Sequence, residues 1–299
     1  MNLLQFWGSV EMGLIYGLVA IGVLISFRVL DFPDLTADGS FPLGAGVSAI
    51  LIVHGVNPWL ATGAALACGL MAGFVTGWLN VRWGILHLLA SILTMTALYS
   101  INLRIMGRPN VAILDETTVL SFMEGLNLSP ILITILFLTI LVILVIGFLF
   151  WFFSSEIGLA LRATGANQKM AQAQGVRTKF TILLGIAMSN GFIALGGALF
   201  AQSQGFADVT LGLGTIVSGL AAVIIGEALF HTRHILLKII SCVLGSIVYR
   251  LAIALALNAG VLGLKASDLQ LVAAIIVGIA MTLPKARNRL VGMFARRPS

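Results

Sequence analysis

Three carboxylates and two hydroxyl side chains stand close together between two apolar runs near the N-terminus: Asp31, Asp34, Thr36, Asp38 and Ser40. Carboxylates within a membrane region are costly and usually face a water-filled cavity or a partner. These five residues are therefore the leading candidates to line a transport pathway or to act as its gate. The alternative role is structural, because Asp, Thr and Ser are common N-caps of helices.

The pattern that holds two of these residues returns in the second half of the chain. Phe-Pro-Asp-Leu-Thr at residues 32–36 is matched by Phe-Ala-Asp-Val-Thr at residues 206–210. An odd number of apolar segments separates the two, so halves of about residues 10–104 and 180–284 are predicted to form an inverted repeat. Such repeats are typical of transporters, with the transport path at their interface. Asp208 and Thr210 join the pathway candidates, although capping of two equivalent helices explains the match equally well.

Three amide side chains complete the set of candidate pathway residues: Asn102, Asn190 and Gln202. Each lies within or beside an apolar run. Hydrogen bonding between helices is the commoner role of such side chains, at roughly 0.6 to 2 kcal/mol each. Contact with a transported solute is the alternative.

The chain that must position these residues has 299 residues, of which 59% are hydrophobic and 9% are charged, with a mean hydropathy of +1.08. A soluble domain carries about 25% charged residues, so an ordinary water-soluble enzyme is excluded. The composition predicts an all-α polytopic membrane protein, a single transmembrane domain over residues 1–299. Its apolar runs predict about nine spanning segments, within a range of roughly eight to ten. One helix is predicted to be broken near residues 31–54, because its apolar part is too short for a hydrocarbon core about 30 Å thick.

No residue set for enzyme chemistry stands out. None of the lysines precedes Ser or Thr, so the chain has no phosphate-binding Walker A motif, and the two cysteines lack the spacing of metal ligands. We therefore expect no catalytic site, no metal and no cofactor on this chain. The net charge of +6 is expected to orient the helices, with no nucleic acid as a partner.

The basic residues predict the orientation of the chain in the membrane. Lys and Arg gather in every second loop and in a basic tail at residues 285–299. The positive-inside rule then places these loops and the C-terminus in the cytoplasm and the N-terminus outside.

The longest polar stretch between membrane segments is the loop at residues 154–179, which is rich in Ala and Gln and lies on the basic side. A short amphipathic helix there would present Ala163, Met170 and Ala171 to a shallow groove of a cytoplasmic partner, with Arg162 and Lys169 at the rim. A helix lying on anionic lipid is the alternative that the residues leave open.

This loop resembles the cytoplasmic coupling loop of ABC importer permeases in the branched-chain amino acid and ribose permease superfamily. Two flanking blocks, at residues 32–41 and 196–229, resemble one subgroup of that superfamily, so the resemblance covers nearly the whole chain. Gln168 departs from the pattern, since many relatives have an acidic residue there. The matching residues are Gly158, Ala160, Arg162, Ala163, Gly165, Asn167, Ala171, Gly175 and Val176. The predicted ATPase-coupling set consists of these residues without Ala160 and Val176, together with Glu156 and Lys169.

The resemblance implies a permease subunit of a bacterial importer in the cytoplasmic (inner) membrane. Its partners would be a second copy of the permease, two ABC ATPase subunits that bind ATP and Mg²⁺, an external solute-binding protein and membrane lipid. The implied cargo is a small, amino-acid-like solute. Two alternatives stay open: an ion-coupled secondary transporter that uses Asp34 or Asp208, and a scaffold or exporter component that uses the loop at residues 154–179 only for assembly.

Overall fold

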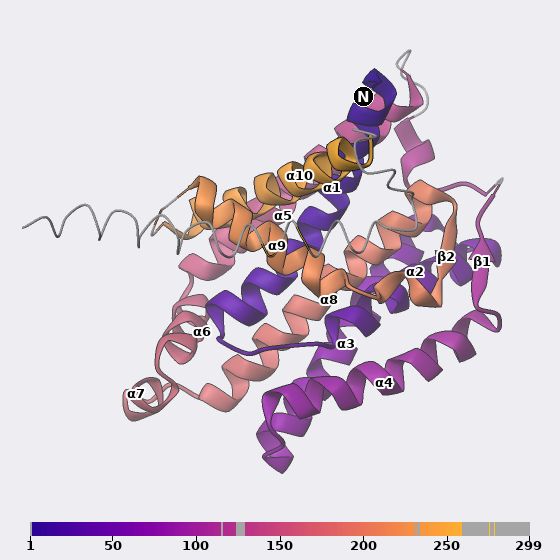
Figure 1. The fold of residues 1–299 in the computed structure, drawn as a ribbon. Coiled ribbons are helices and arrows are strands. Elements are labelled where there is room, and N and C mark those ends of the chain that lie inside the picture. Colours follow the sequence, from indigo (N-terminus) through magenta and orange to yellow (C-terminus); the bar gives the residue numbers. More distant parts are fainter. Residues whose placement is uncertain are drawn as a thin grey trace, which may run out of the picture.

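The fold was analysed in a computed structural model, which describes residues 2–114, 116–123, 129–230, 232, 234–258, 275 and 278. Helices dominate it, as the composition predicts (Figure 1). The long helices are α1 (Leu3–Val23), α2 (Ala37–Val53), α3 (Pro58–Trp83), α4 (His87–Met106), α5 (Pro130–Ser154), α8 (Thr178–Gln204), α9 (Thr215–Leu229) and α10 (Ile235–Asn258). The shorter elements are η1 (Leu24–Val29), β1 (Asn110–Ala112), η2 (Leu120–Met123), α6 (Glu156–Ala166), α7 (Gln168–Ala173), β2 (Phe206–Asp208) and η3 (Val209–Gly212).

Seven helical segments among the described residues are long and apolar enough to cross a membrane. They correspond to α1 with η1, α3, α4, α5, α8, α9 with η3, and α10. The eighth apolar helix, α2, has only 17 residues. The polytopic all-α prediction is therefore confirmed, whereas the count of nine and the inverted repeat stay predictions. Most residues beyond 258 lie outside the described residues. They include the last expected segment, the end of the second predicted repeat half and the basic tail.

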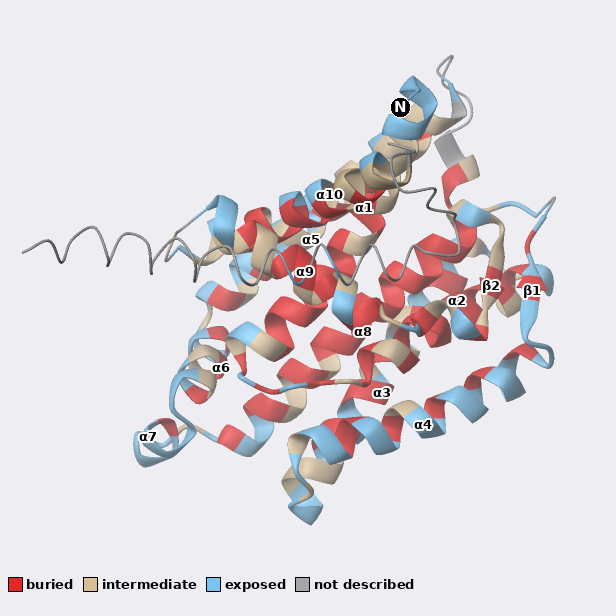
Figure 2. Ribbon diagram, viewed as in Figure 1, coloured by how far each residue is buried: buried red, intermediate tan, exposed pale blue. Residues whose placement is uncertain are grey.

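The core of the bundle lies around α8, which packs against α1, α2 and α3 (Figure 2). Small residues let these helices approach closely. A Cβ added at Gly69 or Gly73 of α3 would collide with the α8 backbone, and one added at Gly13 of α1 would lie 2.7 Å from Cα of Ile247 on α10. These glycine steps therefore pack helices within one subunit, as small-residue motifs do in membranes.

The chain is irregular between the first membrane segment and α2, within and just before the range 31–54 in which a broken helix was predicted. The α1 helix continues into a π-helix, η1, and the chain is then irregular through residues 30–36 until α2 begins. Phe32, Asp34 and Thr36 in this stretch are buried, and Asp31 adopts a left-handed φ of 54°. Irregular backbone at membrane depth is tolerated where protein surrounds it, and here α2, α3, α4, α6 and α8 supply that cover.

Two opposite ends of the bundle carry distinct structures (Figure 1). At one end, the α6 end, α6 and α7 follow the last turn of α5. At the other, the ribbon end, β1 and β2 form a two-stranded antiparallel ribbon that pairs Asn110 with Asp208 and Ala112 with Phe206. The sequence did not predict this ribbon, because three-residue strands leave no periodic pattern to recognise.

Candidate functional site

A buried polar cluster joins the irregular segment to α8. Asp34 is 1% exposed, and its Oδ2 accepts a hydrogen bond from Nδ2 of Asn190 at 2.6 Å. Its Oδ1 accepts from the backbone N–H of Thr36 at 2.9 Å, just before the first turn of α2. The Ser40 hydroxyl donates to Oδ1 of Asn190 at 2.7 Å, and the hydroxyls of Thr36 and Thr76 lie 2.8 Å apart.

This cluster brings together four of the predicted pathway residues, Asp34, Thr36, Ser40 and Asn190. Its members bond to one another, to Thr76 and to nearby backbone, and all are 1% exposed or less. Fully satisfied buried polar networks fix a unique arrangement of the surrounding elements. The geometry therefore makes the cluster an anchor between the irregular segment, α2, α3 and α8.

Asp38 bonds to the second half of the chain. Its Oδ1 accepts from the backbone N–H of Ile216 at 2.8 Å and its Oδ2 from that of Gly214 at 3.4 Å. A carboxylate at this position satisfies free N–H groups of the first turn of α9 and complements the helix dipole. A Cβ on Gly212 would collide with the Asp38 carbonyl oxygen, so the two stretches that share the Asp-x-Thr pattern meet here.

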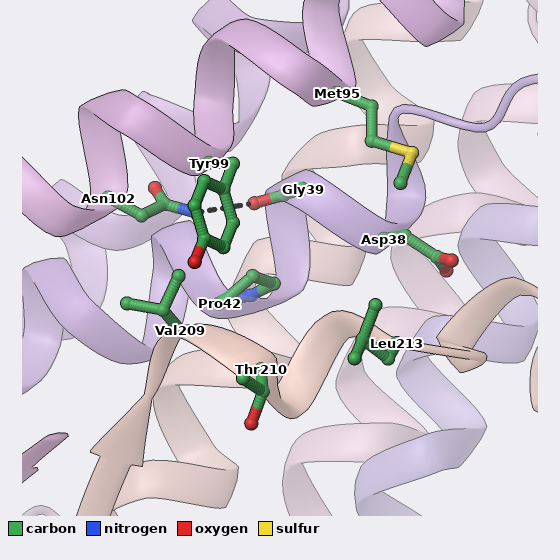
Figure 3. Close-up of a pocket in the computed structure, with 9 residues that line it drawn as sticks. All are labelled: Asp38, Gly39, Pro42, Met95, Tyr99, Asn102, Val209, Thr210 and Leu213. Carbon is green, nitrogen blue, oxygen red and sulfur yellow. Dashed lines mark hydrogen bonds between the residues drawn. The ribbon is translucent and has the colours of Figure 1, made fainter. Parts of the chain in front are cut away.

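A small cavity of about 60 Å³ lies at this meeting point (Figure 3). Asp38, Gly39 and Pro42 come from α2, and Val209, Thr210 and Leu213 form another wall. Residues Met95, Tyr99 and Asn102 of α4 complete the lining.

Asn102 is the buried polar side chain of this cavity. Its amide nitrogen donates to the Gly39 carbonyl oxygen at 3.1 Å, and its Oδ1 is buried with no hydrogen-bond partner in the described part of the chain. Three predicted pathway residues, Asp38, Asn102 and Thr210, thus line one cavity, while its surface is mainly apolar.

Gln202 lies elsewhere, as a link between three elements. Its Nε2 donates to the hydroxyls of Ser48 on α2 and Thr62 on α3, at 2.9 and 2.8 Å, and its Oε1 accepts from the backbone N–H of Val119 at 2.9 Å. Every polar atom of this side chain is engaged within the protein, so the structure places Gln202 in helix packing.

Of the remaining two candidates, Asp31 is exposed and Asp208 is half-buried. Asp31 lies at the α6 end, and Asp208 lies on the ribbon, where Asn110 donates to its Oδ2 at 3.2 Å. Oδ1 of Asp208 accepts from the Thr210 backbone N–H at 2.7 Å, the same turn that Asp34 makes with Thr36. Partial burial acts to raise the pKa of Asp208, but the bonds from Thr210 and Asn110 outweigh it and hold that pKa below its usual value.

The predicted coupling loop forms two helices in place of one. Asn167 separates them: it ends α6, and its Oδ1 accepts from the Met170 backbone N–H at 3.0 Å as the N-cap of α7. Ala163 and Lys169 are exposed, as is Met170, which is 63% exposed, whereas Ala171 is buried against its own chain. Ala171 therefore does not share the exposed face predicted for it.

The glycines of the loop have distinct structural roles. Gly158 packs against the last turn of α5, and a Cβ there would collide with the Phe152 carbonyl oxygen. Gly165 packs in the same way against the Val29 carbonyl oxygen, in the last residue of η1. Gly175 adopts a φ of +85°, which permits the tight turn before α8. Among the other coupling candidates, Glu156 is exposed and Arg162 is half-buried.

Three polar contacts were not predicted from the sequence. The Ser203 hydroxyl on α8 donates to Glu11 of α1, a carboxylate within the first membrane segment. Arg28 forms a salt bridge with Glu227 at 2.5 Å. The Arg250 guanidinium carbon lies 3.6 Å from the centroid of the Tyr16 ring. Glu11 and Arg250 each interrupt an apolar run, and that interruption could have marked them as candidates in the sequence. Their partners could not be found in this way, because they depend on how α1 packs.

Comparison with known proteins places this architecture in a family. Residues 8–283 match the family model described as the permease component of branched-chain amino acid transport systems. A tyrosine transport system permease protein of Clostridioides difficile is 40% identical over 287 residues, 93% of each chain. A fructose import permease protein of Bifidobacterium longum is 25% identical over 290 residues, 94% of this chain and 78% of that one.

A solved structure supports the fold. The complex titled PsaBC from Streptococcus pneumoniae with Fab contains a chain that aligns with a TM-score of 0.51 over 92% of this chain and 89% of that chain, at 17% identity. With the family match over nearly the whole chain and the membrane helices described above, this protein is a member of the branched-chain amino acid transport system permease family.

Proposed function

We propose that this chain is the membrane-spanning subunit of an ATP-driven importer of amino acids, with tyrosine as the leading substrate. The relative named for tyrosine transport is 40% identical, whereas the relative named for fructose import is 25% identical. Similarity along the whole chain therefore favours an aromatic amino acid over a sugar. Two copies form the transport path, and an external binding protein delivers the solute at the ribbon end.

The observation that carries the proposal is the two-sided packing of α6 and α7. Leu161, Thr164 and Ala171 are buried against the same chain, while Ala163 and Met170 face outward. A helix pair fixed on one side and free on the other suits docking into a groove of an ATPase subunit. Arg162, Lys169 and Glu156 supply charge around that face, and the ATP and Mg²⁺ belong to the partner.

A route for the movement leads from α6 into the membrane. Gly165 of α6 packs on the Val29 carbonyl. The side chains of Leu161 of α6 and Leu30 both lie against Gly185 of α8. Movement of α6 by the ATPases would therefore press directly on the irregular segment that precedes α2. The inverted halves would then alternate access around the region lined by Asp38, Asn102 and Thr210.

The proposal is tested by co-expressing this chain with an ABC ATPase subunit from the same genome and measuring co-purification. Ala163→Glu with Met170→Glu adds two charges to the exposed α6–α7 face and should abolish co-purification while the permease stays folded. The matched control is Ala112→Glu, an exposed alanine on the ribbon, which should leave ATPase binding unchanged. Equal binding by the double variant, or no binding by the wild type, would refute the coupling role.

The ion-coupled alternative has weaker support in the geometry. Asp34 is surrounded by neutral hydrogen-bond donors, and the half-buried Asp208 accepts hydrogen bonds from Thr210 and Asn110. Proteoliposomes separate the two mechanisms: uptake that needs ATP inside and survives ionophores supports the importer. Uptake driven by an ion gradient without ATP would favour the secondary transporter.

The proposed location is the bacterial inner membrane, with the ribbon end and the N-terminus outside and the α6 end and the C-terminus in the cytoplasm. Single cysteines introduced at Ala112 and Ala163 test this orientation. A membrane-impermeant maleimide added to intact spheroplasts should label the first and not the second.

A further inference from the structure

Arg250 is an arginine within a membrane-spanning helix. It stands 15 residues beyond Ile235, so it lies about 22 Å along α10 and about 12 Å before its last described residue, Asn258. Charged residues at such depth usually face a partner or a cavity and are candidates for function. Arg250 therefore needs a partner that accounts for its charge.

The described part of the chain supplies an aromatic face but no anion. The guanidinium carbon lies 3.6 Å from the Tyr16 ring centroid, a cation–π contact. Its Nε is buried without a hydrogen-bond partner, and the one salt bridge among the described residues joins Arg28 to Glu227. Stacking on a ring uses the face of the guanidinium and leaves its in-plane N–H donors free for a carboxylate.

The neighbouring membrane carboxylates are engaged by neutral donors. Glu11 accepts from Ser203, Asp34 from Asn190 and the Thr36 backbone, and Asp38 from the first turn of α9. None of them lies within ion-pair distance of Arg250. The counter-charge of Arg250 must therefore come from outside this set.

Helix geometry separates Arg250 from the lipid-facing side of α10. Leu244, Val248 and Leu255 are 39%, 41% and 56% exposed and lie on one face. At 3.6 residues per turn, Arg250 points about 140° away from that face. It lies on the side where Gly13 of α1 meets α10, so a bilayer phosphate is not its natural partner.

An aromatic cluster continues from the stacked ring into the bundle. The Tyr16 ring centroid is 5.5 Å from that of Phe41 and 6.4 Å from that of Phe200, and Phe200 lies 6.2 Å from Phe206. A guanidinium whose N–H donors are free, placed beside aromatic rings, complements a ligand that has a carboxylate and an apolar or aromatic side chain.

We propose that the Arg250 guanidinium, held over the Tyr16 ring, binds the carboxylate of the transported amino acid in its membrane passage. The inference rests on the proposed function and extends it, because it assigns substrate contact to the permease itself. Tyr16 is a positioning residue that fixes the plane of the guanidinium.

The test uses proteoliposomes that contain the permease, its ATPase and its binding protein, with radiolabelled L-tyrosine. Arg250→Gln should lower uptake at least tenfold while basal ATP hydrolysis changes less than twofold. Arg250→Lys keeps the charge but loses the paired N–H donors of the guanidinium, and should lower uptake by an intermediate amount. The matched control, Lys238→Gln, removes a positive charge near the start of the same helix and should transport as the wild type does.

A second experiment measures ligand binding by the permease in the absence of the binding protein. The detergent-solubilised permease should be stabilised against heat by millimolar L-tyrosine and not by tyramine, which has no carboxylate. Arg250→Gln should be stabilised by neither compound. If this variant does not fold, the same comparison is made with Arg250→Lys, whose stabilisation by L-tyrosine should be reduced.

Several results would overturn the assignment. Uptake by Arg250→Gln at the wild-type rate would refute it and leave the proposed importer intact, whereas no ATP-dependent uptake by the wild type would refute both. Equal stabilisation by L-tyrosine and tyramine would also refute it.

Discussion

Replacement of Asn190 by leucine removes the amide that holds the irregular segment against α8 while keeping a similar volume. Two hydrogen bonds to other elements are lost, from Nδ2 to Asp34 and from Ser40 to Oδ1. Each bond between membrane helices contributes roughly 0.6 to 1.7 kcal/mol. An unsatisfied buried polar group costs a further 1 to 3 kcal/mol or so. We therefore expect Asn190→Leu to lower the free energy of unfolding by about 2 to 6 kcal/mol.

The assay is thermal unfolding of the detergent-solubilised protein, followed by the monodisperse fraction that remains after heating. At roughly 2 °C or more per kcal/mol for a chain of this size, the Tm should fall by about 5 °C or more. The control is Thr96→Val on α4, whose hydroxyl bonds only to its own helix at Ile92 and Leu93. That change should shift the Tm by less than about 1 °C.

A double-mutant cycle isolates the contact between the two side chains. With Asp34→Asn in the background, Asn190→Leu should cost clearly less than it does in the wild type, because the carboxylate that loses its partner is already neutral. An unchanged Tm for Asn190→Leu alone, or strict additivity in the cycle, would contradict the anchoring role of this pair.

Three further outcomes follow from the geometry. Gly73→Leu should prevent α3 from approaching α8, because a Cβ at Gly73 would already collide with the Ile186 carbonyl oxygen. It should abolish recovery of folded protein in size-exclusion chromatography. The control Gly63→Leu should be recovered normally, because nothing lies within 4 Å of a Cβ at Gly63. Glu227→Gln breaks a solvent-exposed ion pair with Arg28 and should lower stability by less than about 1 kcal/mol, an effect that should vanish in high salt; a larger loss in the same melting assay would contradict this. Because the folded-state pKa of Asp208 is lowered, its contribution to the ribbon is fully present above about pH 4, near the unfolded pKa, and is lost as the pH falls through the folded pKa. Amide-exchange protection of Thr210, corrected for intrinsic exchange, should therefore drop on acidification below pH 4 or so in the wild type and be independent of pH in Asp208→Asn, whose amide oxygen can accept the same bond.

The sequence by itself determined the features that depend on local pattern. Long apolar runs dictate helices in lipid, because each backbone polar group must be satisfied within its own segment, and the described helices follow those runs. The short apolar run after the polar stretch predicted the break before α2. The shared Asp-x-Thr spacing gave the same turn at Asp34 and at Asp208, since such turns involve only neighbouring residues.

Only the tertiary structure decided which of these residues meet. The contact between Asp34 and Asn190, the engagement of Asp38 with α9 and the stacking of Arg250 on Tyr16 join positions far apart in the chain. The burial of Ala171, one residue from exposed Met170, was equally unpredictable from the sequence. Such contacts depend on the rotation and depth of each helix in the bundle. Close packing of small residues sets both, and a largely apolar sequence permits many alternatives before the helices assemble.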